Sequence, residues 1–334
     1  MKKIWIISLL IGLVVLNISC DNEVDLTAEF KDIPVVYGIL SPKDDAHYIK
    51  IERAFLGGDN SNALEIAKIP DSLYYENLDV KIEEVSSGTV YTLNRVDGNE
   101  EGLVREEGVF ADSPNYLYKF TEELNEGEEY LLRINRGDDK DEITASTTIV
   151  SDFSFTTPQI PTDINIQYRP FTLAWKRTDG AFFYDVSMRF RFLEEDADNI
   201  GTFEEKMIQW DIVKNTSVED AGGSNTFFIN FEGEEFYRFL GAELDDNGGA
   251  QRIFVSLDFV VDAGGQELFD FINIGQANTG ITSSQVIPTY SNLSEGYGVF
   301  SSRNRVPYEG FTLKAAARDS LANGFYTKTL GFDF

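Results

Sequence analysis

The chain has 334 residues, and 57 Asp and Glu against 28 Lys and Arg give it a formal net charge of −29. This acidity argues against nucleic acid as a partner, because affinity for nucleic acid is dominated by cations that meet phosphate groups. Hydrophobic residues at 42% and aromatic residues at 13% supply the material for packed cores and exclude a disordered chain.

The chain contains one cysteine, Cys20, and one histidine, His47. A single cysteine cannot form an intramolecular disulfide, so the domains must be stabilised by packed cores. A single histidine excludes His-rich zinc sites and argues against a Ser-His-Asp triad. His47 opens a predicted strand and has no partner motif, so we expect it at the surface. Because no catalytic motif appears elsewhere, we predict no catalytic residue, no metal site and no cofactor.

Residues 1–19 have the layout of a lipoprotein signal peptide. Lys2 and Lys3 form a positive start, and residues 4–16 are apolar but too short to span a bilayer comfortably. Cys20 follows directly after this leader. We therefore predict cleavage before Cys20 and lipid attachment to it, and two or more acyl chains would make the anchor stable. The alternative is ordinary signal-peptide cleavage beside a coincidental cysteine.

Residues 20–32 are polar and acidic and form a predicted tether. Beyond the tether, residues 33–152 alternate apolar and polar side chains in short runs that turn residues separate. The predicted strands lie at residues 35–40, 48–55, 80–82, 90–93, 116–120, 130–134 and 143–150. Seven short strands with regular turns predict an N-terminal β-sandwich domain.

Residues 124–130 resemble the tyrosine corner of immunoglobulin-like and fibronectin-type sandwiches. In that motif a tyrosine hydroxyl bonds to the backbone a few residues upstream and fixes a crossing loop. Tyr130 is therefore predicted to be structural and not catalytic.

Residues 155–161 break the strand pattern with two prolines, so we place a domain boundary there and assign residues 158–334 to a second domain. Phe171, Leu173 and Trp175 alternate with other residues and share one face of a predicted strand. This periodicity predicts that Trp175 lies in the core. A sugar-stacking platform is the alternative interpretation of this tryptophan.

The second domain carries more strands and a few short helices. The predicted strands lie at residues 171–175, 183–190, 207–212, 226–230, 252–261 and 325–334. The predicted helices lie at residues 234–240, 266–272 and 315–321. The first two strands, with a tryptophan and then a tyrosine, resemble strands B and C of a fibronectin-type sandwich. The predicted fold class is thus mainly β, with two immunoglobulin/fibronectin-like β-sandwich domains and a few short helices in the second.

Residues 284–302 contain a distinctive motif, in which a proline-containing segment leads to the pattern S-N-hydrophobic-x-x-G-h-G-h-F at residues 291–300. This motif resembles one in a Bacteroidota outer-membrane lipoprotein family of the domain-of-unknown-function 4249 type. Residues 35–38 and 124–130 fit the same family pattern. The resemblance implies an exported, lipid-anchored, two-part β-rich protein that is often encoded beside TonB-dependent receptors. It implies no catalytic residues.

The same motif supplies a candidate binding loop, made of Asn292, Gly296, Gly298 and Arg303. The two glycines permit backbone torsions that other residues avoid, and Asn292 suits a turn. Phe300 is expected to fill the core behind that turn. A purely structural loop and a loop that contacts a ligand both fit these residues.

Ser72 and Ser320 each stand in an Asp-Ser-Leu sequence that resembles a short O-glycosylation acceptor. Acidic clusters at residues 138–142, 194–198 and 245–248 raise the alternative of a calcium site. None of the three has the spacing of an EF-hand, so we interpret them as solvated charge between strands.

Together these features predict an outer-membrane lipoprotein, on the cell surface or the periplasmic face, that binds a ligand or assists a TonB-dependent receptor. The membrane is contacted through the lipid of Cys20, and the receptor through loops of the second domain, including residues 291–303. A structural or adhesive surface lipoprotein is the alternative, and a hydrolase with unrecognised carboxylates is a third. The sequence does not identify the ligand.

Overall fold

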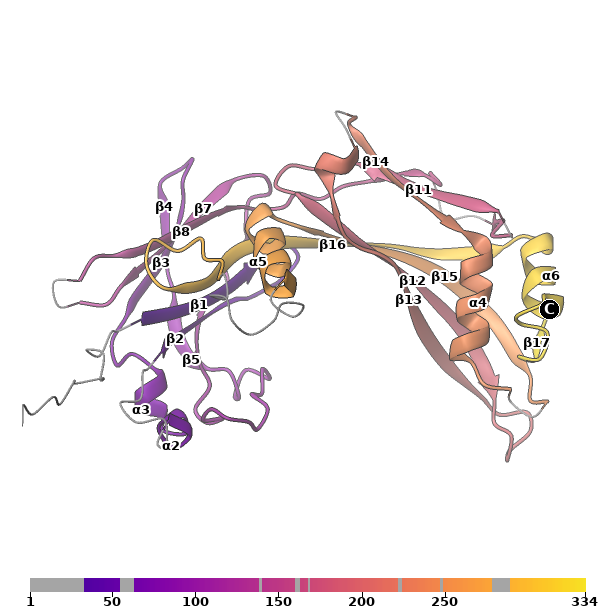
Figure 1. Cartoon of the computed structure of the whole chain (residues 1–334), viewed down its shortest axis with the longest axis horizontal. Coiled ribbons are helices and arrows are strands. Elements are labelled where there is room, and N and C mark those ends of the chain that lie inside the picture. Colours follow the sequence, from indigo (N-terminus) through magenta and orange to yellow (C-terminus); the bar gives the residue numbers. More distant parts are fainter. Residues whose placement is uncertain are drawn as a thin grey trace, which may run out of the picture.

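The structure is a computed structural model that describes residues 33–54, 63–137, 140–159, 163–167, 169–221, 224–246, 249–277 and 289–334. The predicted leader, Cys20 and the tether lie outside the described residues, as does the start of the motif at residues 284–302. Strands hold 48% of the residues and helices 15%, which confirms a mainly β fold with few short helices. Figure 1 shows two lobes joined in an arch, with one long strand running between them.

The first lobe is a sandwich of two antiparallel layers, which the N-terminal half of the chain builds. One layer contains β1 (Ile33–Leu40), β2 (His47–Ala54), β6 (Tyr116–Phe120) and β5 (Asn94–Asp97), in that order. The other layer contains β4 (Thr89–Thr92), β3 (Asp79–Glu84), β7 (Glu129–Asn135) and β8 (Ile143–Thr148), also in that order. Inward residues alternate with outward ones along these strands, as half-buried strands require.

The second lobe places a small sheet against a larger one. The small sheet contains β14 (Thr226–Glu232), β11 (Pro170–Lys176) and β9 (Phe155–Thr157). The larger sheet contains β13 (Phe203–Ser217), β12 (Phe183–Glu195), β15 (Arg252–Gly264) and β16 (Tyr297–Leu313). Two short strands extend it, β10 (Asp163–Ile164) on β16 and β17 (Phe332–Asp333) on β15.

The 17-residue strand β16 belongs to both lobes. Its first part pairs in parallel with β1, from Val35 opposite Tyr297 to Leu40 opposite Ser302. Its second part pairs antiparallel with β15, so one ten-stranded sheet passes through both lobes. The division into domains at residues 33–152 and 158–334 stays a prediction, but the pairing shows that residues of the C-terminal part complete the first sandwich.

The helices lie in both lobes. The predicted helices in the C-terminal half are present as α4 (Gly233–Glu243), α5 (Gln266–Ala277) and α6 (Ala315–Asn323). Two further helices that were not predicted, α2 (Ala63–Ala67) and α3 (Pro70–Leu73), lie in the first lobe. Pro70 opens α3, a position where its missing N–H and fixed φ suit a helix start. No helix among the described residues is long and apolar enough to cross a membrane.

α5 lies at the junction of the lobes, against β16 (Figure 1). Its Phe269 ring packs against Phe183 of the second lobe, with ring centres 5.7 Å apart, and its Phe271 ring meets Tyr37 of the first lobe at 6.0 Å. Within the first lobe, the hydroxyl of Ser302 in β16 donates to the carbonyl of Thr148 in β8 at 2.6 Å and so connects the two layers of that sandwich. The two lobes are therefore joined by side chains as well as by one strand.

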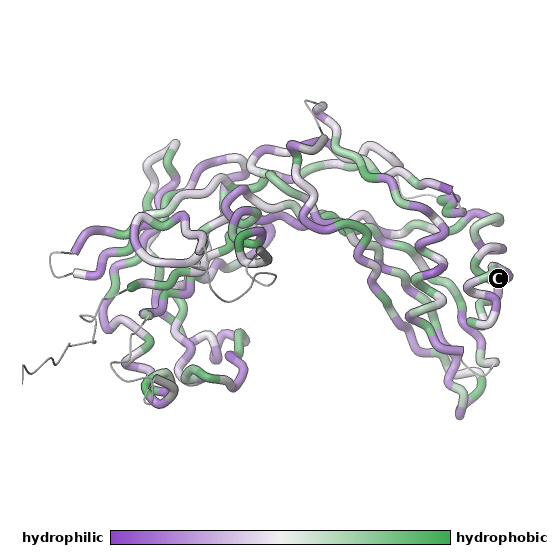
Figure 2. The backbone as a smooth tube through the Cα atoms, in the orientation of Figure 1, coloured by the Kyte–Doolittle hydropathy of each residue, from purple (hydrophilic) through white to green (hydrophobic). Residues whose placement is uncertain are grey.

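Several predictions for single residues are confirmed. Trp175 is fully buried, with 0% of its surface exposed, and Phe300 is also buried. The hydroxyl of Tyr130 accepts a hydrogen bond from the backbone N–H of Asn125 at 2.9 Å, which is the predicted tyrosine corner. Figure 2 shows the alternation of hydrophilic and hydrophobic residues along the strands on which the core predictions were based.

Two predictions are wrong. His47 is only 3% exposed, because it shares the inward face of β2 with Ile49 and Ile51 and stacks on Phe120, with ring centres 4.6 Å apart. The strand expected over residues 325–334 is limited to β17, since residues 324–330 form turns. The hydroxyl of Thr327 is buried in those turns and donates to the carbonyl of Ser320.

Candidate functional site

A pocket of about 630 Å³ opens in the first lobe, between α3, the ends of β2 and β5, and the β5–β6 loop. We call it the Arg–Tyr pocket, after five of its lining residues: Arg53, Arg95, Tyr74, Tyr75 and Tyr116. Its volume falls in the range of pockets that hold small molecules. Other pockets are of similar size, but this one combines that volume with two arginines and three tyrosines, so it is the candidate functional site.

The two arginines reach this pocket because of their places on the strands. The inward face of β2 carries apolar residues up to Ile51, and Arg53 takes the next inward position, where the core ends. Its Nη2 donates to the carbonyl of Asp71 at 2.6 Å, and its guanidinium lies 5.5 Å from the centre of the Tyr75 ring. The side chain is thus fixed on one side by α3 and on the other by an aromatic ring.

Arg95 stands on the edge strand β5 and is held in a similar way. Its guanidinium carbon lies 3.7 Å from the centre of the Tyr116 ring, which is close stacking. Its Nη1 donates to the carbonyl of Glu76 at 3.0 Å and approaches that of Tyr75 at 3.4 Å. Burial raises the pKa of Tyr118, its partner across the sheet, and Arg95 opposes that rise.

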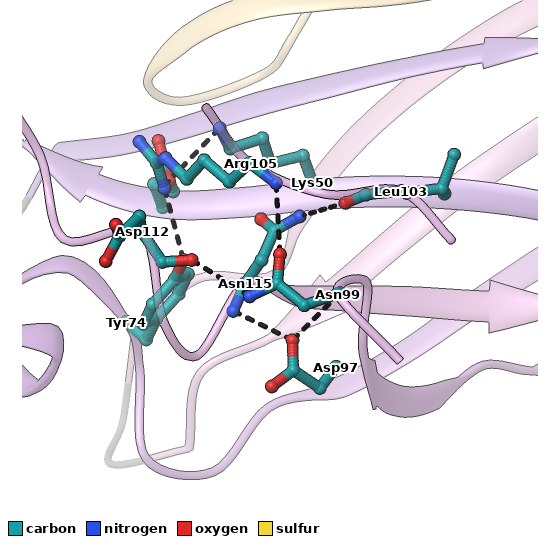
Figure 3. Close-up of polar contacts among 9 residues, drawn as sticks. Lys50, Tyr74, Asp97, Asn99, Leu103, Arg105, Asp112 and Asn115 are labelled. Carbon is teal, nitrogen blue, oxygen red and sulfur yellow. Dashed lines mark hydrogen bonds and ion pairs between the residues drawn. The ribbon is translucent and has the colours of Figure 1, made fainter. Parts of the chain in front are cut away.

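The back wall of the pocket is fixed by an ion pair. The Nη1 of Arg105 lies 2.6 Å from Glu52 and donates to the hydroxyl of Tyr74 at 3.2 Å (Figure 3). Lys50 adds a second cation, 3.3 Å from the same carboxylate. Burial raises the pKa of the Tyr74 hydroxyl, an effect that Arg105 opposes. Tyr74 therefore remains a neutral, oriented group.

The β5–β6 loop, which forms another wall, is fastened by its own side chains (Figure 3). The carboxylate of Asp97 accepts the backbone N–H groups of Asn99 and Asn115, each at 3.0 Å. The Asn99 side chain then donates to the carbonyl of Asp112 at 2.9 Å and accepts the N–H of Arg105 at 3.0 Å. These bonds hold the long β5–β6 loop in one conformation, so this wall of the pocket is preformed.

Sequence reasoning did not find this pocket. Its residues come from four segments whose spacing in the chain follows no motif, and α3 and β5 were themselves not predicted. The available signals were weak: a Tyr-Tyr doublet at residues 74–75 behind Pro70, and two arginines, Arg53 near the end of one predicted strand and Arg95 just after another. Only the fold brings these segments together.

The structure places the predicted binding loop at the edge of the first sandwich. The amide of Asn292 donates to the carbonyl of Phe300 at 2.7 Å and accepts its N–H at 3.0 Å, and it also reaches the carbonyl of Ser146 at 3.3 Å. The side chain thus joins β16 to β8. These contacts give Asn292 a structural role, and ligand binding by this loop stays a prediction.

The backbone geometry explains why glycine occupies two positions of this loop. Gly296 and Gly298 have φ values of +97° and +123°, which side-chain-bearing residues rarely adopt. A Cβ on Gly298 would overlap the carbonyl oxygen of Val36 in β1, and one on Gly296 would meet that of Pro34. They allow β16 to approach β1 closely.

Arg303 lies apart from these three residues. It is exposed near the middle of β16, at the junction of the lobes, and it lines a second pocket of about 520 Å³. Two other cations of that pocket are paired, Lys43 with Asp152 at 2.9 Å and Arg305 with Asp262 at 2.6 Å. The predicted loop therefore divides between a sheet edge and a junction pocket.

The remaining predicted sites lie on helices or in loops. Ser72 is a partly buried residue of α3, and Ser320 is a partly buried residue of α6 whose hydroxyl donates to the carbonyl of Ala316 at 3.0 Å. Glycosylation of either serine stays a prediction. Across the described part of the chain, no group of three or more His, Cys, Asp or Glu side chains is placed to hold a metal ion. The acidic cluster at residues 138–142 lies partly outside that range.

The fold and the pocket define a class: a two-lobed β-sandwich protein with a preformed polar and aromatic pocket in one lobe. Residues 21–308 match the family described as a domain of unknown function, DUF4249. The chain belongs to that family. No curated protein matches it.

Solved structures show only distant similarity. The calcium-binding domain CBD12 of CALX1.1 is 9% identical, with 80% of this chain and 98% of that chain covered and a TM-score of 0.15. Trypsin-activated alpha-2-macroglobulin from Escherichia coli is 9% identical over 84% of this chain and 15% of that chain, with a TM-score of 0.17. The C-terminal globular domain of an oligosaccharyltransferase from Pyrococcus abyssi is 11% identical over 85% and 50%, with a TM-score of 0.18. These low scores support no argument about fold or function.

Proposed function

We propose that this protein is a lipid-anchored binding module of the outer membrane that assists a TonB-dependent receptor. The observation that carries the binding function is the Arg–Tyr pocket, with two oriented guanidiniums and three tyrosines in a preformed wall. A pocket whose polar groups are fixed before the ligand arrives loses little entropy on binding, so it suits a binding module. The lipid anchor, the outer-membrane location and the receptor are supported only by the resemblance of the motif at residues 291–300 to that of the lipoprotein family.

The anchor rests on the sequence. Residues 1–19 form the leader and Cys20 the lipid attachment site. The chain is strongly acidic and carries no polybasic segment, so lipid would have to hold it at the membrane. The Cys20→Ala variant should therefore move to the soluble fraction, and membrane binding that survives a high-salt wash would refute the anchor.

The receptor contact is expected at residues 291–303 and the neighbouring loops. Residues 297–302 pair with β1, so this segment lies at the first lobe and the junction and not at the far end of the second lobe. Arg303 is exposed at the junction of the lobes, where it pairs with Gly264, two residues before α5 begins.

Crosslinking in intact cells tests the partner. The experiment uses the lipidated protein at native expression, followed by purification through a tag and identification of crosslinked proteins. Recovery of an outer-membrane receptor supports the proposal, and an Arg303→Glu variant should reduce that recovery. Recovery of this protein alone, with a receptor gene beside its own, would count against the receptor and leave a structural or adhesive role.

A further inference from the structure

We infer that the Arg–Tyr pocket binds the oxyanion of a small ligand, a carboxylate or a phosphate group, between Arg53 and Arg95. This inference deepens the proposed binding function and rests on it. Both guanidiniums contact the same residue, Tyr75, one over its ring and one at its carbonyl, so they face a common space.

The donors needed for an oxyanion are present. A guanidinium carries five N–H donors in a planar fork that matches a carboxylate or phosphate. Arg53 uses its Nε and Nη2 on carbonyls of α3, and Arg95 uses Nη1 on carbonyls of the following segment. These bonds consume part of each fork, and because both residues line the pocket, their remaining N–H groups are available to a ligand there.

Neither of these two arginines forms an ion pair with a carboxylate among the described residues. Several other arginines do form such pairs, such as Arg105 with Glu52, Arg133 with Glu83 at 2.8 Å and Arg252 with Glu194 at 2.5 Å. Within the described residues, Arg53 and Arg95 contact carbonyls and rings instead. The chain has about twice as many acidic as basic residues, yet these two guanidiniums have no carboxylate partner among the described residues. An anionic ligand would supply the opposite charge.

Asp71 and Glu76 limit what the ligand can be. Their backbone carbonyls hold the arginines, while their exposed carboxylates also line the pocket. A ligand with negative charge at every edge would be repelled by them. The pocket therefore suits a ligand with an oxyanion at one end and hydroxyl or amino groups at the other.

A purely structural role for the arginines is the competing interpretation, because their bonds also fasten residues 71–76 to the sheet. The two interpretations differ in one measurable respect. A structural clamp changes stability alone, whereas an oxyanion site binds a free anion in the intact protein.

The test is titration calorimetry on the full chain purified in detergent, with glycerol 3-phosphate, glycerate and uncharged glycerol as probes, because the two anions carry one oxyanion at one end and hydroxyl groups at the other. Glycerol 3-phosphate or glycerate should bind at one site and glycerol should not, and the tighter of the two anions identifies a phosphate or a carboxylate ligand. Arg53→Gln and Arg95→Gln should each weaken the binding by about tenfold or more, as expected for a lost charge-assisted hydrogen bond.

The matched control is Arg189→Gln, on β12 of the second lobe, whose side chain contacts Gln209 at 3.4 Å. It removes the same charge far from the pocket and should leave the affinity unchanged. Thermal unfolding of each variant shows whether the pocket still forms.

A second pair of variants keeps the test decisive if the arginine variants unfold. Glu76→Gln and Asp71→Asn remove exposed negative charges from the pocket wall without touching the carbonyls, so folding should be preserved. Each should strengthen binding of the anion by roughly two- to fivefold, because a repulsion is removed. Failure of both anions to bind at millimolar concentration, or equal affinities in all variants, would overturn the inference. Anion binding without receptor recovery would instead refute the receptor and leave the pocket in place.

Discussion

The two lobes reach stability by different means. The buried core of the second lobe is rich in aromatic rings, including Trp175, Tyr184, Phe190, Phe227, Phe236, Phe259 and Phe311. The core of the first lobe consists mainly of Val, Leu and Ile, and its connections are fixed by single polar side chains such as Tyr130 and Asn292. Large buried rings stabilise the second lobe because they remove much apolar surface from water, whereas the polar contacts stabilise the first lobe because they fix the conformation of its connections.

This difference explains where the candidate site lies. In the second lobe, α4 and α6 pack Phe236, Leu240 and Leu321 into the core, so the rings are covered. In the first lobe, the connections around α3 and between β5 and β6 have only a small buried cluster of their own, Leu73, Tyr74 and Ala111, and hydrogen bonds hold the rest. Such connections can form a polar pocket without exposing a hydrophobic core.

The largest expected effect is on the second lobe. Trp175→Ala should lower the free energy of unfolding by about 3–5 kcal/mol, because it removes a fully buried ring. Its neighbours Tyr184 and Phe227, with ring centres at 5.1 and 5.2 Å, cannot fill the cavity without moving. Denaturant unfolding measures the loss. Phe325→Ala is the control, since that ring is 79% exposed and its removal should change little.

The next effect tests whether the lobes unfold together. Gly298→Ala forces a Cβ into the Val36 carbonyl at a φ of +123°, and should destabilise the protein on the order of 3 kcal/mol. Hydrogen exchange should rise first in β1 and the start of β16. Gly88→Ala is the matched control: its φ is +69° but nothing lies near its Cβ, so about 1 kcal/mol is expected. Unchanged exchange in β1 would show that this pairing does not couple the lobes.

Tyr130→Phe sharpens the comparison within the first lobe. It removes a hydroxyl that accepts the N–H of Asn125 at 2.9 Å and donates to Glu84 at 3.3 Å, and should cost about 1–2 kcal/mol. The ring stays, so the apolar core is unchanged. Tyr91→Phe, on a partly buried ring of the same lobe, serves as control. Equal stability of the two variants would contradict a structural tyrosine corner.

The sequence predicted what depends on local periodicity. The first-lobe strands other than β5, the burial of Trp175 and the tyrosine corner follow from alternation and from one short motif. The strand β16 could not be predicted, because Gly298, Pro307 and Gly310 lie within it and read as turn residues. Its first part pairs with β1, more than 250 residues earlier in the chain, and its second part pairs with β15. Periodicity carries no information about such pairing.

The burial of His47 was missed for a related reason. An isolated histidine at a strand end is usually exposed, but the register of β2 against β6 places it opposite Phe120. The Arg–Tyr pocket was missed because four separate segments form it. Both the burial of His47 and the formation of the pocket depend on where the residues lie in the fold and not on residue type.

The smallest expected effects are on the pH dependence of stability. The contributions of His47 in the first lobe and Asp185 in the second should change with pH in opposite directions. In the first lobe, burial lowers the pKa of His47, the only histidine of the chain, although Asp44 and the Glu122 backbone oppose this. The unfolded chain therefore binds more protons below pH 6.5, and stability falls as the pH drops from there toward the pKa of the folded state. His47→Gln should flatten this part of the curve.

In the second lobe, burial raises the pKa of Asp185, and the carboxylate of Asp262 adds to that rise, while the N–H of Asn215 opposes it. A carboxyl whose pKa is raised on folding contributes stability below its ordinary value of 3.8 and loses that contribution as the pH rises through the folded value. Asp185→Asn should therefore make stability less sensitive to rising pH, the reverse of the His47 effect. Unfolding midpoints from pH 4 to pH 8 measure both slopes. If the two variants shift the pH curve in the same direction, the burial assigned to one of these side chains is wrong, and with it the packing of that lobe.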